Sequence, residues 1–232
     1  MIIVRDHESR GHTKISWLDS HHTFSFGSFH DPKNMGFGAL RVINDDRVAP
    51  AGGFGQHGHR DMEIITYVLE GALEHRDSLG NGSIIVPGDV QRMSAGTGIT
   101  HSEFNASKSE SVHFLQLWII PEEQGIAPSY EQKHFRIGDR QGQLRLIGDR
   151  SGTEGAVTIY QDVRLFAGQL THNESLTHDI ADGYRAWLHV ARGIMRLNGQ
   201  ELREGDGAAI TDEPQINLET EHQAEVLLFE LP

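Results

Sequence analysis

The chain has 232 residues, with 33 acidic and 20 basic side chains and a formal net charge of −13 at pH 7. This acidic balance, without any compensating basic run, argues against direct binding to nucleic acid, because lysine and arginine must neutralise the phosphates there. The chain has no cysteine, which excludes disulfides, thiolate-ligated zinc sites and iron–sulfur clusters.

Short runs rich in β-branched and aromatic residues follow one another along the chain and are separated by Gly, Asp, Asn and Pro. Such runs with turn residues between them are typical of β-strands in a sandwich or barrel. The clearest ones are residues 63–69, 83–86, 114–119, 156–160, 187–190 and 225–231. The sequence therefore predicts an all-β fold.

One strand-and-turn pattern occurs twice. The run at residues 66–70 leads through Gly71 and a hairpin to Gly88-Asp89, and the run at residues 188–192 leads through Gly193 and a hairpin to Gly205-Asp206. This internal similarity predicts two related β-barrels in tandem, joined near residues 125–136. We therefore expect an N-terminal domain over residues 1–130 and a C-terminal domain over residues 131–232.

Two pairs of potential metal ligands stand at strand spacing. His57 and His59 form one i, i+2 pair, and His101 and Glu103 form the other. Side chains at i and i+2 project from the same face of a strand, so each pair can reach a common ion at bond lengths of about 2.1 Å. If the two strands face each other, four ligands converge on a single mononuclear site.

The segments around these pairs resemble known cupin motifs. Residues 55–63, GQHGHRDME, with the later Gly71 are similar to the first cupin motif, and residues 88–105, ending in AGTGITHSEFN, are similar to the second. Three upstream segments, WLD at 17–19, HTFSF at 22–26 and MGFGALRVINDD at 35–46, resemble the N-terminal region of the pirin family. This resemblance implies two tandem, jelly-roll-like cupin barrels, that is, a bicupin.

The resemblance leaves two glutamates to consider as the fourth ligand. In many cupins the glutamate of the first motif binds the metal, and Glu63 stands at that position. The pirin resemblance implies instead that Glu103 completes the site. We assign the ligand role to Glu103 and expect Glu63 to lie beside the ligands, since Glu63 shares strand parity with His57 and His59.

A set of three imidazoles and one carboxylate suits Fe(II), Mn, Co, Ni, Cu or Zn, and we expect one divalent ion per chain, with Fe(II) the first choice. The pirin resemblance implies quercetin 2,3-dioxygenase-type activity, in which dioxygen opens the ring of a flavonol. The expected partners are thus a small phenolic substrate and dioxygen. Glu103 is the expected base for the flavonol 3-hydroxyl proton.

An apolar slot for a flat aromatic substrate needs aromatic or thioether walls. Phe54, three residues before His57, is the first candidate. The further candidates are Phe24, Phe26, Met35, Phe37 and Phe104.

The second barrel lacks the corresponding ligands. Aligning the repeats places Asp179, Ala181 and Arg185 opposite His57, His59 and Glu63. The same alignment places Leu218 and Thr220 opposite His101 and Glu103. Leucine and alanine cannot bind a metal, so we expect the C-terminal barrel to be a structural partner.

A different functional class stays open, because the pirin resemblance also covers redox-responsive binding proteins that regulate a partner without turnover. The sequence has no signal-peptide pattern and no run near the ~20 apolar residues that span a bilayer, so we expect a cytoplasmic protein without membrane contact. We expect a monomer, in which the paired barrels cover each other's sheets.

Overall fold

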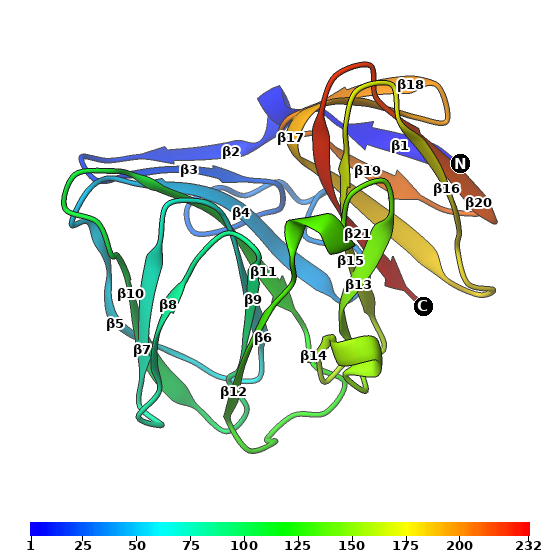
Figure 1. The fold of residues 1–232 in the computed structure, drawn as a ribbon. Coiled ribbons are helices and arrows are strands. Elements are labelled where there is room, and N and C mark those ends of the chain that lie inside the picture. Colours follow the sequence, from blue (N-terminus) through cyan, green and yellow to red (C-terminus); the bar gives the residue numbers. More distant parts are fainter. The chain divides into compact units, whose positions relative to one another are not determined.

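The structure is a computed structural model that describes residues 1–232, apart from the side chain of Ile137. Its elements are β-strands and three short 3-10 helices, which confirms the all-β prediction. None of the helices described is long and apolar enough to cross a membrane. The chain forms two compact units (Figure 1).

The N-terminal unit comprises residues Gly11–His134 and Val157–Gln161. Its strands are β2 (Gly11–Lys14), β3 (Leu18–His22), β4 (Leu40–Val48), β5 (Gly53–His59), β6 (Glu63–Glu70), β7 (Leu73–Asp77), β8 (Gly82–Ile85), β9 (Asp89–Ser94), β10 (Ile99–Asn105), β11 (Val112–Ile119), β12 (Ser129–His134) and β14 (Val157–Thr158).

The C-terminal unit comprises residues Met1–Arg10, Phe135–Ala156 and Asp162–Pro232. Its elements are β1 (Ile2–Arg5), η1 (His7–Ser9), η2 (Ile137–Asp139), β13 (Leu144–Asp149), η3 (Thr153–Gly155), β15 (Arg164–Leu170), β16 (Ser175–Asp179), β17 (Arg185–Leu197), β18 (Gln200–Arg203), β19 (Gly207–Ile210), β20 (Gln215–Glu219) and β21 (Ala224–Leu231).

The chain exchanges two segments between the units, which a single boundary at 130/131 does not describe. The main change of unit falls between His134 and Phe135. The first strand, β1, pairs with β19 of the C-terminal unit, with Ile2 opposite Ile210. In the other direction, residues 157–161 join the N-terminal unit. The repeated strand-and-turn pattern, from which the boundary was predicted, does not indicate that either segment belongs to the other unit.

The N-terminal unit contains two antiparallel sheets. Seven strands have the order β12-β9-β6-β11-β4-β3-β2, and four have the order β5-β10-β7-β8. Val48, Val68 and Phe114 of the larger sheet share one buried apolar cluster with Leu73 and Ile85 of the smaller sheet. The two sheets therefore enclose an interior, to which the even-numbered residues of β4, β6 and β11 point.

The C-terminal unit is built around a sheet with the order β1-β19-β17-β21-β15-β13. A second layer consists of β16, β20, β18 and the end of β17, which pair with one another. Leu188, Val226 and Leu228 from the long strands pack in one cluster with Leu202 and Leu218 from the second layer.

The predicted repeat has matching backbone details in both units. Gly71 and Gly193 have φ values of +75° and +79°, and a Cβ on either one would collide with a carbonyl oxygen, of Ser111 or of Gln223 respectively. At the later turn, Asp89 accepts a hydrogen bond from the Val86 N–H (3.1 Å), and Asp206 accepts one from the Arg203 N–H (2.8 Å). Equivalent glycine and aspartate residues thus form the same turns in both barrels, which supports the prediction that the two barrels are related repeats.

Replacing Gly193 with alanine is expected to destabilise the C-terminal unit. The positive φ and the collision with Gln223 should together cost ~1–3 kcal/mol. Urea unfolding followed by circular dichroism should show a lower midpoint. The matched control is Gly138→Ala, because a Cβ at Gly138 meets no atom within 4 Å, and its midpoint should stay unchanged. Equal midpoints for Gly193→Ala and wild type would contradict the strain argument.

Candidate metal centre

The three histidines predicted as ligands converge at one end of the smaller sheet in the N-terminal unit. β10 pairs antiparallel with β5, which places His101 opposite His57. The ligand nitrogens of His57, His59 and His101 all lie within 4.8 Å of one another, and the Nε2 atoms of His57 and His101 are 3.0 Å apart. Two nitrogens bound at right angles to an ion at ~2.1 Å would stand about 3.0 Å apart, so the spacing fits a shared metal.

The backbone of β5 fixes the orientation of the His57 ring. The Nδ1–H of His57 donates to the carbonyl oxygen of Gly55 at 2.8 Å, so Nε2 is the nitrogen left for a metal. This contact occurs where the β5–β10 register shifts, between His101 and Glu103. A Cβ on Gly53 would collide with the backbone of β10, so the close approach of the two strands requires glycine there.

Burial keeps two of these imidazoles neutral, which is their metal-binding form. Burial is the main cause that lowers the pKa of His59 to about 4, and the neighbouring His57 adds to the shift. Burial is the main cause that lowers the pKa of His101 to about 2, and the nearby His57, His59 and His75 add to the shift.

Glu103 lies beside His101 in the interior and is held from the opposite sheet. The Gln116 side-chain amide donates to both carboxylate oxygens, at 3.0 and 2.9 Å, and the Thr66 hydroxyl lies 3.4 Å from Oε1. A Glu103 oxygen forms a second group within 4.8 Å with ligand nitrogens of His75 and His101. The structure thus gives two overlapping trios that share His101. Burial raises the pKa of Glu103, while the Gln116 hydrogen bond opposes that rise.

Glu63 does not join this group. Its Oε2 accepts hydrogen bonds from the Ser94 hydroxyl (2.9 Å) and from the Tyr160 N–H (3.2 Å). Glu63 is on the opposite face of β6 from Thr66, which contacts Glu103. The parity argument fails because β5 ends at His59 and β6 begins at Glu63, with Asp61 at a φ of +48° in the turn between them.

His75 is a neighbour of the metal centre that the sequence analysis missed. It is fully buried on β7, where the register places it opposite Glu103. Its Nδ1 lies 3.5 Å from the Nδ1 of His101, and its Nε2 lies 3.4 Å from the Asp77 carboxylate. Asp77, His75 and His101 therefore form a chain behind the metal-facing nitrogen of His101. The available signal was a third i, i+2 pair, His75 and Asp77, in the strand after Gly71.

Replacing His75 with alanine should weaken metal binding. Residues that orient a ligating histidine commonly contribute ~10–100-fold to metal affinity, and His101 would lose that contact. Competition with a chromogenic chelator would measure the affinity for Ni(II). His75→Asn, which keeps a polar group beside His101, should recover part of the loss. An unchanged affinity for Ni(II) in His75→Ala would show that His75 does not orient His101 and only fills space in the core.

A pocket of about 430 Å³ adjoins the metal centre in the N-terminal unit. His57, His59 and Glu103 line one side of it. Aromatic rings continue from there: the Trp118 ring is 5.0 Å from His59, and the Phe26 ring is 5.4 Å from Trp118, both edge to face. The apolar lining residues are Leu18, Phe26, Phe54 and Trp118.

Two of the six residues predicted for an apolar slot, Phe26 and Phe54, line this pocket. Phe104 neighbours Glu103 on β10, so it points to the other face of the strand and is 39% exposed. Phe24 is buried in the core, and Met35 is 42% exposed. Phe37 forms an isolated backbone bridge with Leu40. Trp118 was missed, although the run at residues 114–119 was predicted as a strand.

The remaining wall of the pocket is polar and comes from β3 and β4. β3 and β4 contribute Ser20, His22, Asn44 and Asp46, and the further lining residues are Thr13, Gly27, Ser28 and Gln116. The His22 ring bridges Asn44 Oδ1 (2.8 Å) and the Thr13 hydroxyl (2.9 Å). Burial is the main cause that raises the pKa of Asp46 to about 7.

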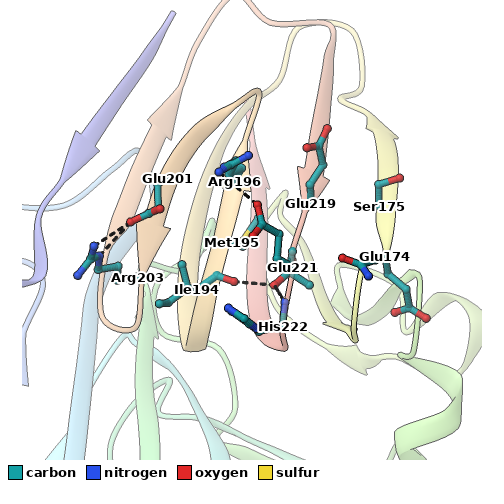
Figure 2. Close-up of a pocket in the computed structure, with 12 residues that line it drawn as sticks. Glu174, Ser175, Ile194, Met195, Arg196, Glu201, Arg203, Glu219, Glu221 and His222 are labelled. Carbon is teal, nitrogen blue, oxygen red and sulfur yellow. Dashed lines mark hydrogen bonds and ion pairs between the residues drawn. The ribbon is translucent and has the colours of Figure 1, made fainter.

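A pocket of about 450 Å³ in the C-terminal unit has a different lining (Figure 2). Four of its charged side chains form two ion pairs, Arg203 with Glu201 at 2.9 Å and Arg196 with Glu221 at 3.3 Å. The Thr220 hydroxyl donates to the Ile194 carbonyl oxygen at 2.7 Å, and Leu218 packs in the core. Over the described residues, none of the trios with metal-binding spacing belongs to this lining.

Comparison with known proteins identifies both halves of the chain. The pirin family model matches residues 4–119, and the model for the quercetinase C-terminal cupin domain matches residues 146–231. The chain is 47% identical to quercetin 2,3-dioxygenase of Escherichia coli K12 over all of this chain and 99% of that protein. It is 42% identical to a putative quercetin 2,3-dioxygenase of Pseudomonas aeruginosa, over the full length of both.

Solved structures agree with these matches. The structure of YhhW from Escherichia coli superposes with a TM-score of 0.95 at 46% identity, over 100% of this chain and 98% of that one. The bacterial pirin YhhW in complex with nickel(II) superposes with a TM-score of 0.94 at 47% identity, over 100% of this chain and 99% of that one. The prediction of two tandem cupin barrels is therefore confirmed. The chain belongs to the pirin family.

Proposed function

We propose that this protein is a metal-dependent dioxygenase that opens the ring of a flavonol such as quercetin. The observation that carries the proposal is the pocket of the N-terminal unit, where aromatic walls lead to three converging imidazoles and a buried carboxylate. A flat phenolic molecule fits such a slot by its apolar faces and presents its hydroxyl groups to the polar end.

The relatives support the same reaction class. The Escherichia coli relative bears the name quercetin 2,3-dioxygenase. Flavonol ring opening is thus our inference for this chain, drawn from the similarity over its whole length.

We assign a single divalent ion to His57, His59, His101 and Glu103. The neutral imidazoles and the carboxylate suit Fe(II), which we retain as the expected native metal, and also Ni(II), which the related YhhW structure contains. When bound, the metal supplies Lewis acidity toward a substrate oxygen and a site for oxygen chemistry.

The residues of the chain would hold and deprotonate the substrate. Phe26, Phe54 and Trp118 would confine the flat ring system and exclude water from the reacting end. Glu103 would take the proton of the flavonol 3-hydroxyl onto a carboxylate oxygen. The Gln116 amide keeps that carboxylate in place.

Oxygen uptake tests this proposal. Purified protein reconstituted with Fe(II) or Ni(II) should consume oxygen steadily when quercetin is added, with one oxygen molecule used for each ring opened. Reconstituted His101→Ala serves as the control and should show only the background rate. If wild-type protein binds metal and quercetin without turnover, the enzymatic role is contradicted and a regulatory, metal-dependent binding role of the pirin type takes its place. A monomeric state and a cytoplasmic location remain expectations from the sequence.

A further inference from the structure

Asp46 is an acidic side chain in the pocket that the proposed reaction leaves unused. It lies on β4, whose even-numbered residues point to the interior, and it lines the same pocket as His57, His59 and Glu103. It is 4% exposed, so the carboxylate is almost entirely removed from bulk water.

The hydrogen bonds of Asp46 are incomplete. Its carboxylate has a side-chain hydrogen bond with Ser20, its cross-strand neighbour on β3. The buried Oδ1 has no hydrogen-bond partner among the residues that the structure describes. The other two buried carboxylates nearby are engaged: Asp45 contacts His113 at 2.7 Å, and Glu103 accepts from Gln116. A buried acceptor without a partner is costly, so this oxygen points to a missing donor.

The surroundings of Asp46 favour a neutral hydroxyl as that donor. Burial raises the pKa of Asp46 to about 7, and the nearby carboxylates of Asp45 and Glu103 add to the rise. The nearby carboxylates of Asp45 and Glu103 would repel an anionic ligand group from this wall. A phenolic hydroxyl carries no charge and donates a hydrogen bond, and its aromatic ring suits the adjoining apolar wall.

We propose that Asp46 is a specificity-determining residue, whose Oδ1 accepts a hydrogen bond from a second hydroxyl of the substrate, other than the hydroxyl presented to Glu103. This inference rests on the proposed function, because that function places the first hydroxyl at the metal centre. Asp46 belongs to β4 and Glu103 to β10, so the two carboxylates can hold two different groups of one ligand. The pocket would then select polyhydroxylated aromatic substrates over those with a single hydroxyl.

Two probe molecules separate the two hydroxyl positions. Quercetin carries several ring hydroxyls, whereas 3-hydroxyflavone keeps only the 3-hydroxyl. Their affinities would be measured by anaerobic titration of the full-length, Ni(II)-loaded protein, which prevents turnover. Asp46→Ala should lower the affinity for quercetin by about 10–100-fold, because the substrate hydroxyl would be left buried without an acceptor. The affinity for 3-hydroxyflavone should stay within about 2-fold of wild type.

Further variants distinguish loss of the Asp46 hydrogen bond from misfolding of the protein. Asp46→Leu removes the carboxylate while filling its space, and it should show the same loss of discrimination as Asp46→Ala. Asp46→Asn keeps an acceptor oxygen and should recover part of the quercetin affinity. Asp19→Asn is the matched control, since Asp19 is a carboxylate on the neighbouring strand β3 that does not line the pocket. Its ratio of quercetin to 3-hydroxyflavone affinity should equal that of wild type.

An equal loss for both probes, or no loss for either, would overturn the assignment of Asp46. Turnover of quercetin by the wild type, measured in the same preparations, distinguishes this failure from failure of the proposed function. Oxidation without dependence on Asp46 removes only the assignment, and discrimination without oxidation removes only the dioxygenase function. Failure of wild-type protein to bind quercetin removes both.

Discussion

Replacing Glu103 with glutamine should lower flavonol ring-opening by at least ~100-fold, the lower range for loss of a general base. The substitution keeps side-chain length but removes the negative charge and the basic oxygen. The Gln116 amide would then face a neutral group in place of the carboxylate that it now holds at 3.0 and 2.9 Å. Part of the metal should remain on the three histidines. Quercetin turnover and metal content would be measured on the same samples.

Glu63→Gln is the contrasting variant and should leave turnover and metal content close to wild type. Glu63 is fully buried but bonds Ser94 and the Tyr160 backbone, away from the metal centre. Its loss should appear as reduced stability. The assignment of Glu103 would be refuted by the reverse pattern, in which Glu63→Gln strips the metal and Glu103→Gln leaves metal and turnover intact.

Replacing His101 with alanine should produce a folded protein with little bound metal. His101 belongs to both of the trios at this metal centre, so its loss leaves neither trio complete. The fold should persist because His101 belongs neither to the apolar cluster of Val68 and Phe114 nor to that of Ile64 and Met93. Metal analysis after dialysis should give a single ion per chain for wild type and almost none for the variant.

His21→Ala provides a matched control for His101→Ala. His21 belongs to a more exposed trio with His12 and Asp19 on β2 and β3, whose ligand atoms also lie within 4.8 Å of one another. We expect this variant to keep the full metal content. Full occupancy in His101→Ala would show that the ion binds elsewhere in the chain.

The core of the site could be predicted because it depends on local geometry. His57 and His59, like His101 and Glu103, project from one face of one strand, which the i, i+2 spacing alone determines. The pairing of β5 with β10 then brings His57 opposite His101. Local composition likewise predicted the strands at residues 63–69 and 225–231, which are runs rich in β-branched and aromatic residues.

Features that depend on turns and on long-range pairing could not be predicted in the same way. Glu63 was placed near the ligands by counting through the turn at Asp61, but a turn starts a new strand and resets which face a residue occupies. Phe104 was a candidate for the apolar slot, but it neighbours Glu103 on β10, and alternation sends adjacent side chains to opposite faces of a strand. Single positions in short apolar runs carry no sign of which face is buried.

His75 and Asp46 are residues near the site that the sequence did not reveal. His75 lies beside the metal centre because β7 pairs with β10, and Asp46 lines the pocket because β4 pairs with β3 and β11 in the opposite sheet. The i, i+2 spacing of His75 and Asp77 marks two polar side chains on one strand face, but neither this pair nor Asp46 indicates which other strand lies opposite. The registers of those strand pairs supply the missing information.

Everything proposed for the pocket depends on one metal ion bound at its inner end. The direct measurement is anomalous diffraction at the nickel edge from crystals of Ni(II)-loaded protein. We predict a single strong peak surrounded by the Nε2 atoms of His57 and His101, a ring nitrogen of His59 and a carboxylate oxygen of Glu103. A peak at His12, Asp19 and His21, or at Asp6, His7 and Asp206, with none at this centre, would contradict the assignment.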